Sequence, residues 1–173
     1  MKIYRLKREQ YLPVSQESAW RFFSQPINLS EITPPWLKFR PTQKAPNDIY
    51  AGLIISYRLK PILGVPVTWI SEITHVREPD YFVDEQRSGP YKFWHHQHFF
   101  KTVGSETQVR DVVHYAIGYG LAGRLVHRFM VSPKLADIFD YRHEKLKRMF
   151  RPPVQQKFDP NGSGMTNLTV NSD

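Results

Sequence analysis

The sequence predicts an α+β domain in which a curved antiparallel sheet of six or seven strands wraps around one long C-terminal helix. The middle of the chain is rich in β-branched and aromatic residues and is interrupted at regular intervals by turn residues, which is typical of a strand meander. Residues 133–150 instead place apolar side chains at helical spacing. We expect this helix to cover the apolar face of the sheet, because no other element is both long and amphipathic.

The N-terminal part is expected to form one strand and two short helices. Residues 2–12 alternate between polar and apolar side chains, as a half-buried strand does. Ser15 is a suitable N-cap for a helix that ends before Pro26. A second helical turn fits residues 28–33, because two prolines follow and the residue before a proline avoids helical geometry.

Five further strands are expected between residues 53 and 119. The segments between them are short and rich in turn-forming residues, for example Ser88-Gly89-Pro90, and short connections favour antiparallel neighbours. The predicted strands are residues 53–59, 65–76, 81–87, 91–101 and 107–119.

The long C-terminal helix is expected to start with Ser132 as its cap and Pro133 at its first position. The glycine-rich stretch 118–123 is then a connection between strand and helix. Residues 153–173 have few apolar groups, so we expect a disordered tail. Residues 1–152 are expected to form a single domain.

Composition excludes several function classes. The chain of 173 residues has no cysteine, which excludes a disulfide framework, a zinc knuckle and a thiol nucleophile. No apolar run is long enough to span a bilayer, and the N-terminus alternates where a signal peptide would have an apolar block. We therefore expect a soluble, cytoplasmic protein.

The chain is basic, with 24 Lys and Arg against 16 Asp and Glu and a net charge of +8. Most basic residues are scattered, and two clusters stand out, in residues 2–8 and 142–151. Solvated faces of a strand and a helix explain both clusters, so we do not expect nucleic-acid binding. Weak contact with an anionic membrane surface is compatible with the same two clusters.

Three stretches of the sequence carry a resemblance to a known family. They are Asn28-Leu29 with Ile32-Thr33-Pro34-Pro35-Trp36-Leu37; Phe82-Val83-Asp84-Glu85-Gln86 with Ser88-Gly89-Pro90-Tyr91; and Trp94-His95-His96-Gln97-His98-Phe99 followed by Arg110-Asp111. These stretches, together with the order of elements, resemble the START-like or helix-grip superfamily, also called SRPBCC, over residues 2–150. Within it the sequence is similar to a bacterial branch of polyketide cyclase/dehydrase-like and ligand-binding proteins. The resemblance implies a cavity between sheet and helix that holds an apolar or amphipathic small molecule.

The histidines of residues 94–100 form the most informative constellation. Side chains two residues apart share a face of a strand, so His96 and His98 are expected to point the same way. If the following hairpin loop is residues 103–106, His98 lies opposite Asp111. An imidazole beside a carboxylate has a fixed tautomer and a raised basicity, which makes His96, His98 and Asp111 the catalytic candidates.

Four interpretations of these histidines remain open. They can form a structural polar network, with His98 and Asp111 satisfying one another, or provide polar contacts to a ligand. They can act as a general acid or base. Metal binding needs a third ligand, which Asp84 or Glu85 would supply depending on register. The sequence alone favours the structural network, and we predict no metal and no cofactor.

The ligand-binding candidates come from the sheet, the last helix and one loop. Trp36 follows two prolines and could act as a lid at the mouth of the cavity. Arg142 is the charged member of the apolar helix stripe and could meet an acidic group of a ligand or Asp84. The complete set is Trp36, Asp84, Trp94, His96, His98, Asp111, Tyr115, Phe139, Arg142 and Leu146.

Three functions fit these observations. The first is a monomeric or weakly dimeric protein that binds a hydrophobic or amphipathic small molecule as a carrier. The second is a cyclase or dehydratase acting on a polyketide-like or lipid-like substrate, in which His96, His98 or Asp111 moves a proton. The third is a peripheral lipid-handling protein at an anionic membrane.

Overall fold

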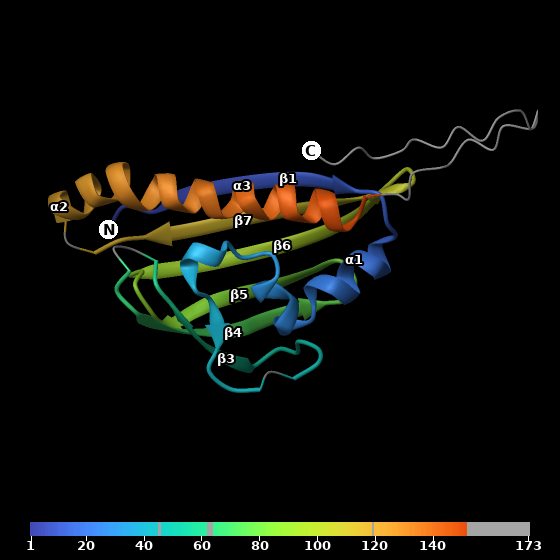
Figure 1. Cartoon of the computed structure of the whole chain (residues 1–173), viewed down its shortest axis with the longest axis horizontal. Coiled ribbons are helices and arrows are strands. Elements are labelled where there is room, and N and C mark those ends of the chain that lie inside the picture. Colours follow the sequence, from blue (N-terminus) through green and yellow to red (C-terminus); the bar gives the residue numbers. More distant parts are fainter. Residues whose placement is uncertain (45, 62–63, 119, 152–173) are drawn as a thin grey trace, which may run out of the picture.

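The protein is an α+β domain built on one seven-stranded antiparallel sheet, as a computed structural model shows (Figure 1). The structure describes residues 1–44, 46–61, 64–118 and 120–151. The sheet order is β1-β7-β6-β5-β4-β3-β2, so the first strand pairs with the last one. This order confirms the predicted fold class.

The five strands between residues 53 and 116 and the long C-terminal helix follow the expected order, whereas the helical turn predicted at 28–33 is two short helices, 26–30 and 35–37, and residues 120–131, partly predicted as a connection, are helical. The strands are β1 (Tyr4–Leu12), β2 (Arg40–Pro41), β3 (Leu53–Leu59), β4 (Val67–Arg77), β5 (Tyr81–Ser88), β6 (Phe93–Val103) and β7 (Glu106–Ala116). The helices are α1 (Gln16–Phe23), η1 (Pro26–Ser30), η2 (Pro35–Leu37), α2 (Gly120–Val126), η3 (His127–Val131) and α3 (Ser132–Met149).

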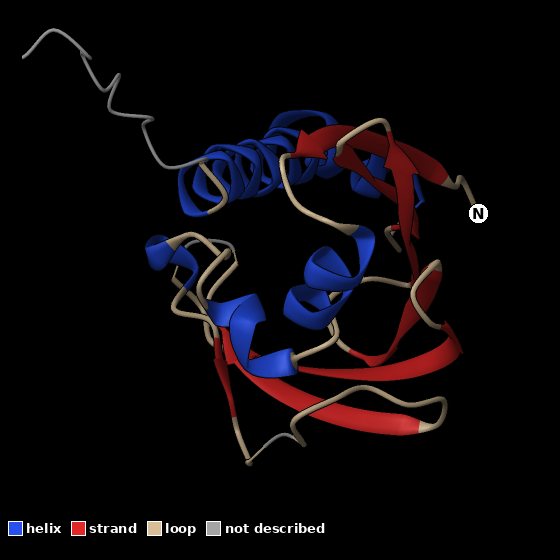
Figure 2. Cartoon of the chain, turned by 90° about the vertical axis from the view of Figure 1, so that its right-hand side faces the viewer, coloured by secondary structure: helices blue, strands red, loops and turns tan. Residues whose placement is uncertain are grey.

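The sheet curls around the helices (Figure 2). Helix α3 lies along β1 and β7, and α1 lies at one end of the concave face, by the C-terminal end of α3 (Figure 1). Two contacts fix α3 on β1: Arg8 pairs with Asp140 at 3.2 Å, and the side-chain amide of Gln10 donates to the carbonyl of His143 at 3.0 Å. The helix is therefore held at one edge of the sheet, which leaves space over the strands beyond it.

Helix α1 begins at the predicted N-cap. The hydroxyl of Ser15 accepts a hydrogen bond from the backbone N–H of Ser18 at 3.2 Å, which satisfies one of the free donors of the first turn. The buried ring of Trp20 packs edge-on against Phe82 and Phe100 of the sheet. Helix α1 thereby closes one end of the core.

The start of the C-terminal helix corrects the sequence prediction. Ser132 does not cap it, because its backbone is helical and the chain is already helical from Gly120. The segment before Pro133 forms a π-helical turn, η3. A proline lacks the N–H and crowds the preceding turn, and a wider turn there lets the helix continue through it. The predicted last strand is shorter accordingly and ends at Ala116.

The buried stripe of α3 faces the concave side of the sheet. Leu135 and Phe139 pack with Trp94 and Tyr115, and Leu146 belongs to the larger core beneath α1. No helix of the described residues is long and apolar enough to cross a membrane. The predicted tail 153–173 lies outside the described residues.

Candidate functional site

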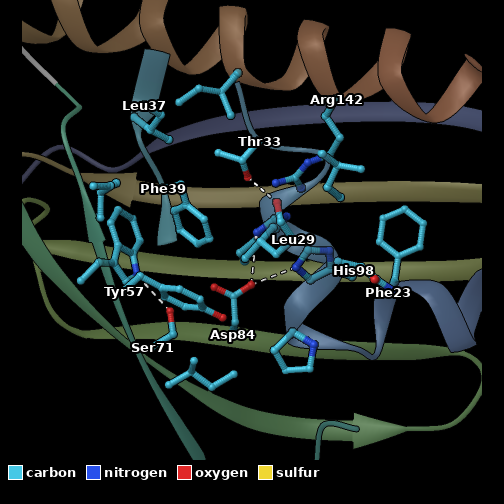
Figure 3. Close-up of a pocket in the computed structure, with 18 of the residues that line it drawn as sticks. Phe23, Leu29, Thr33, Leu37, Phe39, Tyr57, Ser71, Asp84, His98 and Arg142 are labelled. Atoms are coloured by element: carbon cyan, nitrogen blue, oxygen red, sulfur yellow. Dashed lines mark hydrogen bonds and ion pairs between the residues drawn. The ribbon is translucent and has the colours of Figure 1, made fainter. Parts of the chain in front are cut away.

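A cavity of about 170 Å³ lies between the sheet, α3 and the segment from α1 to η2. This volume is close to the roughly 150 Å³ that holds a benzene ring in an engineered protein core. Most of its wall is apolar or aromatic, and it contains Phe22, Phe23, Leu29, Ile32, Leu37, Phe39, Ile49, Ile55, Tyr57, Leu59, Trp69, Ile73, Phe82, Tyr91, Trp94, Leu135, Ile138 and Phe139. The charged or ionisable polar groups of the wall come from α3 and the sheet: Arg142, Asp84, His96 and His98 (Figure 3).

The histidine strand has the predicted register. The hairpin turns between Val103 and Glu106, which places His98 opposite Asp111. His96 and His98 are both buried and point to the concave face. Alternation along β6 therefore delivers two imidazoles to the cavity wall.

The structure resolves the choice between the two acidic residues of β5. Asp84 lies opposite His96 and lines the cavity. Glu85 lies on the other face, where it contacts His95 at 2.8 Å and Arg87 at 3.5 Å. The inner face thus carries two aspartates and two histidines on three adjacent strands, because Asp111 faces the same side from β7.

The hydrogen bonds in this cluster run diagonally across the strands. His96 Nε2 bonds Asp111 Oδ1 at 3.0 Å, and His98 Nε2 bonds Asp84 Oδ2 at 2.9 Å. The expected bond between His98 and Asp111 is absent: Nδ1 of His98 lies 2.9 Å from Asp111 Oδ1, but it has no hydrogen-bond partner within the described residues because the N–H direction does not meet the oxygen. Trp94 donates to the other oxygen of Asp84 at 3.3 Å.

The two carboxyl groups are kept ionised by the imidazoles. Burial alone would raise their pKa, but the bonds of His96 to Asp111 and of His98 to Asp84, together with the charge of both imidazoles nearby, outweigh it, so the pKa of Asp84 and that of Asp111 lie well below the usual range. Burial alone would lower the pKa of His96, but the two carboxylates outweigh it and raise this pKa. His96 therefore bridges two negative groups.

Arg142 reaches from α3 toward the space that Asp84 and His98 face from the sheet (Figure 3). Its side chain is only 7% exposed, and its guanidinium lies 4.9 Å from the centre of the Phe139 ring. Within the part of the chain that the structure describes, its Nε and Nη1 atoms have no hydrogen-bond partner, and no carboxylate lies within 4.0 Å. A buried cation therefore faces the cavity with unused donors.

Six of the ten ligand-binding candidates line the cavity: Asp84, Trp94, His96, His98, Phe139 and Arg142. Asp111 lies one layer behind and contacts the histidines. Leu146 is packed in the core, and the hydroxyl of Tyr115 bonds His127 at 2.9 Å. Trp36 is 41% exposed beneath the ammonium group of Lys134. Ligand contact by these residues stays a prediction.

Sequence reasoning missed a second polar group in the wall, on β4 and β3. Trp69 donates from its indole N–H to the hydroxyl of Ser71 at 2.9 Å, and both side chains line the cavity next to Tyr57. Burial raises the pKa of Tyr57, so its hydroxyl stays neutral and can donate. The signal was present in the sequence, since Trp69, Ser71 and Ile73 alternate on one face of a predicted strand.

Comparisons with solved structures agree with this fold. CV1439 from Chromobacterium violaceum superimposes with a TM-score of 0.65 at 10% identity, covering 86% of this chain and 99% of that one. TTHA0849 from Thermus thermophilus gives 0.59 at 16% identity, covering 84% and 99%. Major latex-like protein 151 from Panax ginseng gives 0.61 at 13% identity, covering 87% and 99%. At such identities the likeness shows the fold alone.

Comparison at the level of sequence gives the family. No curated protein matches the chain significantly. Residues 12–137, which are well over half of the chain and include the cavity-lining parts of the sheet, match the family described as polyketide cyclase/dehydrase and lipid transport. The predicted resemblance to the START-like superfamily is confirmed, and the chain belongs to the polyketide cyclase/dehydrase and lipid transport family.

Proposed function

We propose that this protein binds an amphipathic small molecule with an acidic group in the cavity, as a carrier that acts as a monomer or weak dimer in the cytoplasm. The observation that carries the proposal is the buried guanidinium of Arg142, whose Nε and Nη1 have no partner among the described residues, in a mostly apolar wall. A buried charge without a partner is costly, and proteins avoid it unless a ligand supplies the partner. A carboxylate or a similar anion on the ligand fits this geometry.

The remainder of the wall supports a ligand with an apolar body. Aromatic and aliphatic side chains surround the cavity, and a few polar groups fix orientation, which is the usual composition of a small-molecule site. Four residues of the wall on or beside the short helices, namely Phe22, Phe23, Leu29 and Phe39, are only half-buried, so we infer that a ligand enters beside η1 and η2. Access for a ligand on that side requires no opening of the sheet.

Native mass spectrometry of the freshly purified full chain tests the proposal. We expect an added mass that is released on denaturation and belongs to an acidic lipophilic compound. The Arg142→Met variant should carry less of it than the Arg148→Met variant, which makes the same chemical change at an exposed position of α3. If no adduct is present and neither an acidic nor a neutral apolar probe binds saturably, the carrier proposal is wrong.

One observation favours an enzyme as the second candidate. His96 and His98 line the cavity, and each lies between two carboxylates, which is an arrangement that can hold and move a proton. Under a cyclase or dehydratase function, His98→Gln should keep ligand binding and reduce turnover of the co-purified compound about a hundredfold or more. If His98→Gln converts the co-purified compound as fast as the wild type does, the enzyme function is excluded.

A third candidate, lipid handling at a membrane, is favoured by the exposed apolar side chains of α2 and η3. Leu121, Leu125 and Phe129 are 75%, 62% and 68% exposed. The sequence between Asp111 and Asp137 contains no acidic residue but several basic ones. Such a face suits an anionic bilayer surface. Phe129→Glu should abolish co-sedimentation with phosphatidylserine vesicles, whereas equal binding by the variant excludes this candidate.

A further inference from the structure

We propose that Asp84, His96 and His98 form a binding site for one divalent transition-metal ion at the base of the cavity. One potential ligand atom from each residue lies within 4.8 Å of the others. All three side chains line the cavity, whereas Asp111 does not. The site does not depend on which small molecule the cavity accepts.

The distances between the ligand atoms suit a common ion. Nitrogen and oxygen atoms bound to Zn²⁺ lie about 2.0 to 2.2 Å from it, so two such atoms are about 3.0 to 3.5 Å apart. Asp84 Oδ2 is 2.9 Å from His98 Nε2 and 3.2 Å from His96 Nδ1. The distance to His96 lies within this range, and the distance to His98 is a hydrogen-bond length just below it, so replacing the shared proton by an ion requires only a small outward shift of Asp84.

The second nitrogen of each imidazole faces Asp111. His96 Nε2 lies 3.0 Å from Asp111 Oδ1, and His98 Nδ1 lies 2.9 Å from the same oxygen. Metal-binding histidines usually direct their other N–H to a carboxylate, which fixes the tautomer and the ring orientation. Asp111 is thus the positioning residue for His96, which is left to bind through Nδ1, while His98, whose Nδ1 lies near Asp111 without a hydrogen bond to it, would bind through Nε2.

Charge balance supports a cation here. Two carboxylates are enclosed with two imidazoles on the inner face, and buried charges need compensation. Arg142 does not compensate them, because no carboxylate of the described residues lies within 4.0 Å of it. A metal ion that binds His96 and His98 displaces protons from the imidazoles, and one divalent ion then supplies the positive charge that the two carboxylates need.

The donor set selects the class of ion. Two imidazole nitrogens and one carboxylate oxygen suit Zn²⁺, Co²⁺ or Fe²⁺, whereas Mg²⁺ and Ca²⁺ prefer sites made of oxygen atoms. Three protein ligands leave at least one coordination position open. Because the three residues line the cavity, that position faces the space available to a small molecule.

The test uses the full chain without a polyhistidine tag, stripped with EDTA and free of added small molecules. Calorimetric titration with Zn²⁺ should give one site per chain, and Co²⁺ should give the visible absorption bands of a site with nitrogen ligands. Asp111→Asn should weaken Zn²⁺ affinity about 10- to 100-fold, the usual effect of losing a carboxylate behind a metal-binding histidine. His98→Gln should weaken it further.

His95→Gln is the matched control. His95 also pairs with a carboxylate, Glu85 at 2.8 Å, but on the outer face of the same strand, so its loss should leave Zn²⁺ affinity unchanged. If a variant is unfolded by circular dichroism, NMR of wild-type protein decides: Co²⁺ should shift or broaden the imidazole signals of His96 and His98 before those of other histidines. Absence of stoichiometric Zn²⁺ binding, or binding that His95→Gln removes and His98→Gln does not, overturns the proposal. If the metal-free chain still binds the co-purified compound while it fails to bind Zn²⁺, the metal proposal is wrong and the carrier function stands.

Discussion

Replacing Arg142 with methionine separates the stability of the protein from its ligand affinity. Two buried donors of Arg142, Nε and Nη1, lack partners in the part of the chain that the structure describes, and each unsatisfied donor costs about 1 to 3 kcal/mol. Methionine removes both donors and fills a similar volume. The loss of the cation–π contact with Phe139 costs about 0.5 to 2 kcal/mol in the other direction. We therefore expect the free energy of unfolding of the ligand-free protein to stay unchanged or to rise by up to about 5 kcal/mol.

Ligand affinity should change in the opposite direction. A hydrogen bond to a charged group contributes about 1.5 to 3 kcal/mol, so the variant should bind an acidic ligand about 10- to 150-fold more weakly. Two probes of equal ring size isolate this effect, namely 2-naphthoate, which carries a carboxylate, and 2-naphthol, which does not. Only the affinity for 2-naphthoate should fall, and Arg148→Met should change neither affinity.

Calorimetric unfolding and titration with both probes measure the two effects. For a domain of this size, 1 kcal/mol corresponds to roughly 2 to 4 °C in Tm. A destabilisation of about 2 kcal/mol or more in Arg142→Met would show that the guanidinium is held by structural contacts. An equal loss of affinity for both probes would show that Arg142 shapes the cavity and does not recognise charge.

Three other predictions follow from burial and charge on the inner face. Asp111→Asn should lower the free energy of unfolding by about 3 to 5 kcal/mol in urea titrations, because it breaks a buried ion pair. Glu85→Gln on the outer face should lower it by less than about 1 kcal/mol. Similar losses in both variants would contradict the burial argument. In EDTA-containing buffer, the contribution of Asp111 to the free energy of unfolding should be lost as pH falls below about 4 toward its lowered pKa. The contribution of His96 should be fully present below about pH 6.5 and lost as pH rises through its raised pKa. A free energy of unfolding that does not change from pH 6 to 9 would refute the prediction for His96. Leu146→Ala should lower the free energy of unfolding by about 2 to 5 kcal/mol, because Leu146 is packed on all sides. Phe139→Ala should lower it by less than the roughly 3 kcal/mol usual for a buried phenylalanine, because one side of the ring already faces the cavity. A larger loss for Phe139→Ala than for Leu146→Ala in thermal unfolding would contradict the placement of the cavity.

The sheet and its register could be predicted because short hairpins leave few choices. The two-residue turn after Val103 determines that His98 faces Asp111, and alternation determines which side chains share the inner face. The side-chain bonds could not be predicted in the same way. His98 bonds Asp84 on the other neighbouring strand, because side-chain torsions, and not register alone, decide between an opposite and a diagonal partner.

Two features could not be predicted from the sequence, namely where the C-terminal helix begins and which of Asp84 and Glu85 faces the cavity, and the reasons differ. Pro133 is a good first residue of a helix, and only the π-helical turn before it shows that the helix continues through it. Asp84 and Glu85 are equivalent in alternation until the exact length of the next turn is known. That Nε and Nη1 of Arg142 have no partner among the described residues could also be found only from the structure, because it depends on distances across the whole cavity.

The position of β6 in the sheet has a consequence for motion. This strand is paired on both sides, to β5 and to β7, and it carries both cavity histidines, while the outer wall beside η1 and η2 is made of short helical turns. Amide protons of paired central strands exchange with solvent only through extensive opening, and isolated turns open at much lower free energy. The polar base of the cavity thus keeps its geometry while the wall beside η1 and η2 opens locally. A small molecule can therefore enter and leave without displacing the side chains that recognise it.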